Sequence, residues 1–74
     1  MNLNMASTEG KNSWPELVGV KSEVAENKIK SENPSVKSVN IVPEGSFVTA
    51  DFRTDRVRVW VDEHGIITKV PKIG

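Results

Sequence analysis

Apolar and polar side chains alternate along the stretch Arg56-Val57-Arg58-Val59-Trp60-Val61-Asp62. Successive side chains of a β-strand point to opposite faces, so this alternation predicts a half-buried strand over about residues 56–62. Its three valines would face the core, whereas Arg56, Arg58 and Trp60 would share the opposite face. We therefore take this strand as the centre of the fold.

Turn signals on either side of this strand indicate where its neighbours lie. Asp62-Glu63-His64-Gly65 predicts a hairpin turn, because glycine tolerates the positive φ that such turns need. We expect a return strand over about residues 66–70, ended by Pro71. Earlier in the chain, alternating residues predict another strand over about residues 36–42, which ends at Pro43-Glu44-Gly45.

The segment before these strands predicts one short amphipathic helix over about residues 22–32. Ser22 is a suitable N-cap, and Asn33-Pro34 is a stop signal because proline disfavours helical backbone in the residue before it. The predicted inner face of this helix consists of Val24, Ala25, Lys28 and Ile29.

The chain length indicates one small domain. The chain has 74 residues, which suffices for a single hydrophobic core. Residues 1–12 are polar and without period, and we expect them to form a flexible N-terminal arm. The folded domain would span residues 13–74, with Trp14 anchoring its entrance against the core. The order of elements predicts an α+β fold in which one helix packs on a small β-sheet.

Composition excludes several classes of function. The chain has no cysteine, so disulfides, cysteine-ligated zinc and thiol catalysis are excluded. Ten basic residues balance ten acidic ones, without the basic excess of a nucleic-acid binder. No apolar run is long enough to span a bilayer, and Met1-Asn2-Leu3-Asn4-Met5 lacks the pattern of a signal peptide. We expect no cofactor and neither a nucleic-acid nor a membrane partner, and the compartment stays undetermined.

A catalytic role also lacks support in the sequence. His64 is the only histidine, and it lies in a predicted turn that is remote in sequence from every serine. A catalytic serine needs a positioned base, so we expect that the protein is not an enzyme. One histidine beside Asp62 and Glu63 is weak evidence for a metal site, and we expect none.

A long connection, about residues 44–55, separates the two clearest strands. Connections of this length are uncommon in compact domains and are usually functional or disordered. Bulky and β-branched residues, among them Phe47, Val48, Thr49 and Phe52, favour extended backbone over disorder. An extended and partly apolar segment held away from the core resembles a peptide substrate bound to a protease.

Two arginines follow this connection. Arg56 and Arg58 are two residues apart in a strand, so both guanidinium groups would rise from one face, roughly 7 Å apart. Such groups can hold carbonyl or carboxylate oxygens, and Thr49 and Asp51 in the loop would supply acceptors. This clamp would replace the missing disulfide as the restraint on the loop. The plainer alternative is that both arginines are solvated strand charges.

Three stretches of the chain resemble the potato inhibitor I family of serine protease inhibitors. They are Trp14-Pro15-Glu16-Leu17-Val18-Gly19, the segment from Val48 to Val59, and Val70-Pro71-Lys72-Ile73-Gly74. The similarity runs from about Lys11 to Gly74 with family-like spacings. It implies a wedge-shaped domain with a mixed sheet, in which the strands flanking the loop are parallel and the reactive loop stands at the narrow end. A crossover of a dozen residues is long enough for parallel strands.

The resemblance also implies which residues act. The scissile bond would be Ala50-Asp51. Val48, Thr49, Phe52 and Arg53 would contact the protease, and Arg56, Arg58 and the terminal carboxylate of Gly74 would support the loop.

Alanine at position 50 departs from family members that carry a larger side chain there. It fits a small or shallow primary pocket, so the expected partners are subtilisin-like and elastase-like proteases. Chymotrypsin-like enzymes are a further possible target, but alanine would leave their deeper primary pocket partly empty. We expect a monomer that inhibits by a substrate-like standard mechanism, and the resemblance implies a role in plant defence. The alternative is a small non-inhibitory interaction module that uses the exposed loop or the Arg56/Arg58 strand face, or a family fold that has lost inhibition.

Overall fold

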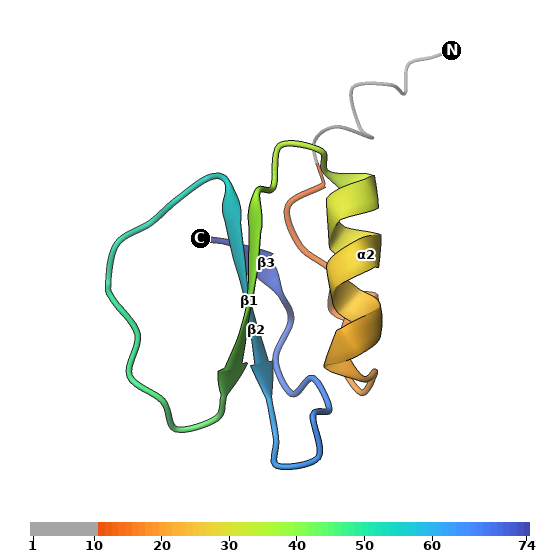
Figure 1. Cartoon of the computed structure of the whole chain (residues 1–74), viewed down its shortest axis with the longest axis vertical. Helices are drawn as coiled ribbons and strands as arrows, with labels where there is room; N and C mark the ends of the chain where they lie inside the picture. The colour runs from red at the N-terminus through yellow and green to blue at the C-terminus, as the bar shows by residue number, and fades with distance from the viewer. Residues whose placement is uncertain (1–10) are drawn as a thin grey trace.

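The structure is a computed structural model that describes residues 11–74 (Figure 1). A short 3₁₀ helix η1 (Pro15–Leu17) precedes the α-helix α2 (Ser22–Glu32) and three strands, which are β1 (Ser38–Pro43), β2 (Arg56–Val61) and β3 (Lys72–Ile73). The strands form one sheet in the order β1-β2-β3, and α2 lies along one side of it, opposite the long loop. The expected α+β fold, one helix on a small mixed sheet, is confirmed.

The central strand β2 determines the sheet. It runs parallel to β1, with Ser38 opposite Arg56 and Pro43 opposite Val61, and antiparallel to β3. The expected parallel pairing is therefore confirmed. The three valines of β2 are buried in the core, as their alternation predicts.

The hydrophobic core lies between α2 and this sheet. Trp14 is completely buried, as are Ala25 and Ile29 of α2, and this confirms that the tryptophan anchors the entrance of the domain. The buried cluster comprises Trp14, Leu17, Ala25, Ile29, Val36, Val57, Val59, Val61 and Ile67. The described part of the chain contains no helix long and apolar enough to cross a membrane.

The N-terminal boundary of the domain lies earlier than expected. Lys11 and Asn12, which the sequence pattern places in the arm, contact the domain: the Lys11 ammonium contacts Glu32, and the Asn12 carbonyl accepts a hydrogen bond from Ile73 N–H over 2.9 Å. The rest of the expected arm, residues 1–10, lies outside the described residues.

The helix has the expected bounds but a narrower buried face. Ala25 and Ile29, four residues apart, are buried and Lys28 is half-buried, whereas Val24 is 53% exposed. Placing Val24 on the inner face was wrong, because α2 meets the core through a single i, i+4 row. Ser22 is also not the N-cap: it is the first helical residue, and Lys21 precedes it without a side-chain cap.

The return strand expected over residues 66–70 is wrong. Ile66 and Ile67 form only isolated bridges, to Lys21 and Val61 respectively. The main chain of Ile67 also bonds to Val20 and Gly19, so this segment shares its hydrogen bonds between β2 and the chain before α2. Pairing with β2 as a strand resumes only at β3. The turn itself is as predicted, with Gly65 at a φ of +78°.

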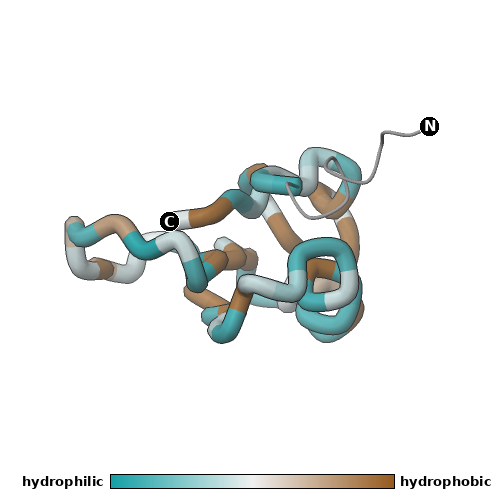
Figure 2. Tube along the Cα trace, turned by 90° about the horizontal axis from the view of Figure 1, so that it is seen from above, coloured by the Kyte–Doolittle hydropathy of each residue, from teal (hydrophilic) through white to brown (hydrophobic). Residues whose placement is uncertain are grey.

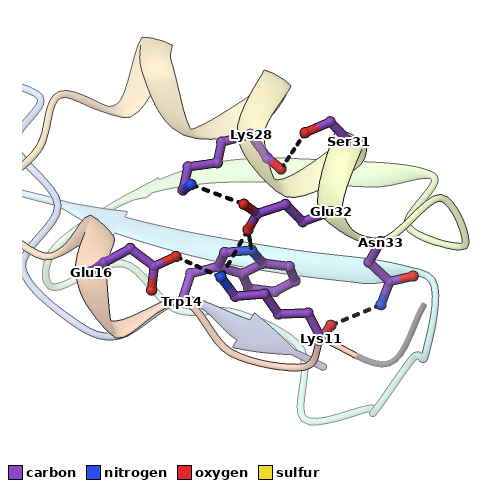
Figure 3. A network of polar contacts seen from close by, with 7 residues as sticks. All are labelled: Lys11, Trp14, Glu16, Lys28, Ser31, Glu32 and Asn33. Carbon is purple, nitrogen blue, oxygen red and sulfur yellow. Dashed lines mark hydrogen bonds and ion pairs between the residues drawn. The ribbon is translucent and has the colours of Figure 1, made fainter. Parts of the chain in front are cut away.

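A carboxylate at the end of α2 joins the N-terminal segment to the helix (Figure 3). One Glu32 oxygen accepts hydrogen bonds from the Trp14 indole N–H at 2.9 Å and the Lys11 ammonium at 2.8 Å. The other accepts one from the Lys28 ammonium at 2.9 Å. The hydrogen bonds from Lys11 and Lys28 lower the pKa of Glu32 to about 2. This contact therefore fixes where the chain enters the domain.

Candidate functional site

The connection between β1 and β2 forms one large exposed loop. A turn at Glu44-Gly45 opens it and a turn at Thr54-Asp55 closes it, and the residues between have no regular secondary structure. Residues 44–54 are all exposed. Figure 2 shows the loop extending from one end of the molecule, away from the helix. The expected long loop is therefore present, with backbone accessible to a partner.

Arg58 of β2 reaches the first half of this loop. Its Nη2 donates a hydrogen bond to the Thr49 hydroxyl over 2.8 Å and lies 3.7 Å from the Asp51 carboxylate. The Arg58 side chain is only 17% exposed, so its position is restricted by the surrounding structure. A planar guanidinium that makes directed bonds holds its acceptor in a defined orientation.

Arg56 reaches the second half of the loop. Its Nη2 donates to the main-chain oxygen of Asp51 over 2.9 Å, and its Nη1 lies 3.3 Å from the Asp51 carboxylate. Its Nε donates to the main-chain oxygen of Gly74 over 2.7 Å. Arg56 is 6% exposed, which is unusual for arginine and is explained by these bonds.

These contacts hold the loop on both sides of one peptide bond. Thr49 precedes Ala50 and is bonded to Arg58, whereas Asp51 follows Ala50 and is bonded to Arg56. Ala50 itself is exposed and makes no hydrogen bond with another described residue. The Ala50-Asp51 bond is therefore accessible, whereas Thr49 and Asp51, the residues on either side of Ala50, are both attached to β2.

The charge on Asp51 is stabilised by the same groups. Its hydrogen bond with the Thr49 side chain, followed by the charge of Arg56, lowers the pKa of Asp51 below its ordinary value of 3.8. The carboxylate is therefore ionised at neutral pH, where it attracts both guanidinium groups.

Gly74 is the centre of a second set of contacts at the base of the loop. Its N–H donates to the main-chain oxygen of Arg56 over 2.9 Å, and its own oxygen accepts from Arg53 N–H over 3.4 Å as well as from Arg56. The Phe52 ring lies beside it, since a Cβ at Gly74 would be 3.5 Å from Phe52 Cδ1. The structure thus brings together all the residues expected to support the loop.

The remaining expected contact residues are exposed. Val48 is 42% exposed and Phe52 69%. The Arg53 guanidinium donates twice to the Asp55 carboxylate, over 3.1 and 3.0 Å, which holds the end of the loop near β2. Phe47 is not among the residues expected from the sequence to contact a protease, but the structure shows that it is fully exposed. The sequence signal for this exposure is an aromatic side chain in a long loop, with no apolar residue directly before it.

Other candidate sites are not supported. His64 is exposed and lies 3.5 Å from the Glu63 carboxylate, and residues 11–74 contain no group of three or more ligands that could hold a metal ion. The Lys69 ammonium lies over the Trp60 ring, 4.8 Å from its centroid, so Trp60 is accounted for as a packing residue.

This arrangement defines a class of protein: a small domain that presents one exposed, restrained segment to the binding site of a partner. Comparison with known proteins specifies the class further. The model of the potato inhibitor I family matches residues 6–74. A relative from Momordica charantia, named Glu S.griseus protease inhibitor, is 58% identical over 66 residues, which cover 89% of this chain and 96% of the relative.

Another relative, subtilisin inhibitor CLSI-I from Canavalia lineata, is 56% identical over 64 residues, which cover 86% of this chain and 95% of that protein. Among solved structures, a bitter gourd trypsin inhibitor superimposes with a TM-score of 0.83 at 52% identity, with 90% of this chain and 97% of that chain covered. The chain belongs to the potato inhibitor I family. Its family and relatives are protease inhibitors and not enzymes.

Proposed function

We propose that this protein inhibits serine endopeptidases by presenting Ala50-Asp51 as a substrate-like peptide bond. The observation that carries this proposal is the attachment of both neighbours of Ala50 to β2, through Arg58 on one side and Arg56 on the other. An enzyme can approach the Ala50-Asp51 bond, because Ala50 is exposed and makes no hydrogen bond with another described residue.

Inhibition follows from the restraint on this bond. The Ala50 carbonyl would enter the oxyanion hole of the protease as a substrate carbonyl does. The loop is already held by Arg58 and Arg56 before a partner binds, so binding orders few additional groups and the complex is tight. If the bond is cut, Thr49 and Asp51 are still held by Arg58 and Arg56. The new ends then stay close together, which favours religation over release.

The choice of target depends on the residue before the cleaved bond. The names of the relatives refer to a Glu S.griseus protease, subtilisin and trypsin, so overall similarity does not specify one enzyme. The Ala50 methyl group fills a small or shallow pocket and leaves a deep one empty, at a loss of about 0.8 kcal/mol for each CH₂ group that is not buried. It has no charge for the acidic pocket of trypsin. Subtilisin-like and elastase-like enzymes are the proposed targets, with chymotrypsin-like enzymes inhibited more weakly, and plant defence is the proposed setting.

A titration of active sites tests the proposal. Increasing amounts of the protein are added to fixed concentrations of subtilisin, elastase, chymotrypsin and trypsin, and the residual activity is measured with a small chromogenic substrate. We expect a linear decrease to one inhibitor per enzyme for subtilisin or elastase, and little inhibition of trypsin. Full activity of all four enzymes at micromolar protein would contradict the proposal and would favour the non-inhibitory interaction module.

A further inference from the structure

Positive charges gather in a hollow on the sheet face that points away from the core. The hollow is open, has a volume of about 420 Å³, and is lined by Arg58, Trp60, Lys69, Val70 and Lys72. Three of these five residues are cations and none is acidic, although the whole chain has a net charge of zero. Sites for small molecules usually have volumes of about 300–1,000 Å³, so the size of this hollow indicates a small ligand and not a folded partner.

Two of the cations face each other across neighbouring strands. Arg58 and Lys72 are directly opposite in the antiparallel pairing of β2 with β3. Side chains in such positions share one face of the sheet with Cβ atoms about 4.5–5.5 Å apart, and like charges there are destabilising. An anion bound between the two side chains would replace this repulsion by attraction to both.

Only part of the Arg58 guanidinium is used within the protein. The side chain is 17% exposed, yet Nη2 is its only nitrogen with an oxygen partner in residues 11–74, namely the Thr49 hydroxyl and the Asp51 carboxylate. Arg56 provides a comparison on the same strand, because its Nε, Nη1 and Nη2 all contact oxygens of the described chain. Largely buried polar groups are normally satisfied by hydrogen bonds. Nε and Nη1 of Arg58 are therefore donors available to a ligand in the hollow.

The two lysines of the hollow also have no carboxylate partner in the described chain. Lys28 and Lys30 of α2 each pair with a glutamate, whereas neither Lys69 nor Lys72 forms an ion pair with another residue of 11–74. The Lys69 ammonium lies over the Trp60 ring, 4.8 Å from its centroid. This cation–π contact holds the ammonium at the hollow without neutralising its charge.

We propose that this hollow is a binding site for closely spaced phosphate groups, such as those of a diphosphate or triphosphate. Three cations around a small volume favour a ligand of high charge density. A phosphate monoester carries about −1.5 to −2 charges at pH 7 and three strong acceptor oxygens, whereas a carboxylate carries one charge and two oxygens. Guanidinium and ammonium groups both bind phosphate, the guanidinium through two parallel hydrogen bonds. The inference does not depend on the proposed function.

Titrations of the whole chain followed by NMR test this site. Tripolyphosphate, orthophosphate and citrate are added separately at low salt, and the indole N–H signals of both tryptophans are recorded. We expect saturable shifts for Trp60, which lines the hollow, and none for Trp14, which is completely buried in the core. Tripolyphosphate should bind at least about 10-fold more tightly than orthophosphate, because several phosphate groups contact several cations.

ATP distinguishes two sources of the same chemistry. Equal affinities for ATP and tripolyphosphate would support recognition of the phosphate chain alone. A higher affinity for ATP would support an organic phosphate whose apolar part contacts Val70, which is 39% exposed at the hollow.

Two double variants provide the matched comparison. Lys69→Gln/Lys72→Gln removes two charges from the hollow, whereas Lys21→Gln/Lys37→Gln removes two exposed charges that do not line it. We expect the first variant to bind tripolyphosphate about 10-fold or more weakly than wild type, and the second to differ by less than about 2-fold. All four lysines are exposed, so the thermal midpoints should stay at the wild-type value.

Three results would overturn the inference. Equal weakening in both double variants would show that the anion responds only to the overall charge of the protein. Citrate that binds as tightly as tripolyphosphate would exclude phosphate as the recognised group. A Trp60 signal that stays unshifted at millimolar tripolyphosphate would exclude the site itself.

Discussion

Arg56 and Asp51 are joined twice, once through the main chain and once through the side chain. Nη2 of the arginine donates to the Asp51 main-chain oxygen over 2.9 Å, and Nη1 lies 3.3 Å from its carboxylate. Because Arg56 also donates to the Gly74 oxygen, one buried side chain connects the loop, β2 and the end of the described chain. Arg58 lacks the contact with Gly74 and reaches only the loop.

Arg56→Ala should therefore reduce both stability and inhibition. It removes two hydrogen bonds donated by a charged group and leaves the Gly74 and Asp51 oxygens without this partner. We expect the free energy of unfolding to fall by about 1.5–3 kcal/mol, the usual contribution of hydrogen bonds to charged groups. Urea denaturation measures this change, and an unfolding midpoint equal to that of wild type would show that Arg56 does not restrain the fold.

Arg58→Ala should separate the two effects. It detaches Thr49 from β2 but leaves every contact of Gly74 in place. We expect a smaller loss of stability than for Arg56→Ala, together with faster hydrolysis of the loop by the protease. Chromatography of intact and cut protein during incubation measures this rate. Equal rates of hydrolysis for wild type and Arg58→Ala would remove Arg58 from the mechanism.

Thr49→Val tests whether Arg58 acts through the Thr49 hydroxyl. The substitution keeps the β-branched shape and removes the acceptor of the 2.8 Å hydrogen bond. If the two residues act together, the double variant Thr49→Val/Arg58→Ala should have about the same inhibition constant as whichever single variant inhibits less well. Additive losses in the inhibition constant would mean that Arg58 supports the loop by another route.

Acid should release the contact around Glu32. Its pKa is lowered to about 2 in the folded protein, so its contribution to stability is present above the ordinary pKa of 4.5 and is lost as the pH falls through about 2. We expect Glu32→Gln to be less stable than wild type at pH 7 and to differ from it much less at pH 2. Thermal midpoints at both pH values measure this. The same difference at both would exclude an electrostatic role for Glu32.

The Asp51 carboxylate should affect loop order in a similar pH range. Because its pKa lies below 3.8 in the folded protein, its restraint on the loop is present above that value and is lost as the pH falls through the lowered pKa. NMR signals of the Thr49 amide should shift in this window in wild type. In Asp51→Asn, which keeps the main-chain bond to Arg56, this shift should be absent. A shift retained in Asp51→Asn would assign the titration to another group.

The alternating residues of β2 predicted much of this structure. Strand period places Val57 in the core and the two arginines together on the other face. The parallel pairing of β1 and β2 was expected from the family resemblance, and the length of the loop is only sufficient for it. The return strand predicted at Ile66 and Ile67 is wrong. Their apolar run is typical of a strand, but their main-chain hydrogen bonds are divided between β2 and the chain before α2. Sequence period contains no information about such a division between partners.

The contacts between distant residues were outside the reach of the sequence. Glu32 is an ordinary helix charge by pattern, and only the folded chain brings Trp14 and Lys11 to it. The exposure of Phe47 likewise depends on the path of the loop, since an aromatic residue is more often buried. By contrast, Thr49 and Asp51 were predicted to face the arginines from their two-residue spacing in extended chain.

The position of the first cut tests the central claim most directly. The protein is incubated for days with a sub-stoichiometric amount of an inhibited protease, and mass spectrometry then identifies the fragments. The proposed mechanism predicts slow cleavage first between Ala50 and Asp51, with intact and cut forms reaching a stable ratio and both still inhibiting. Rapid and complete hydrolysis, or a first cut at any other bond, would contradict it.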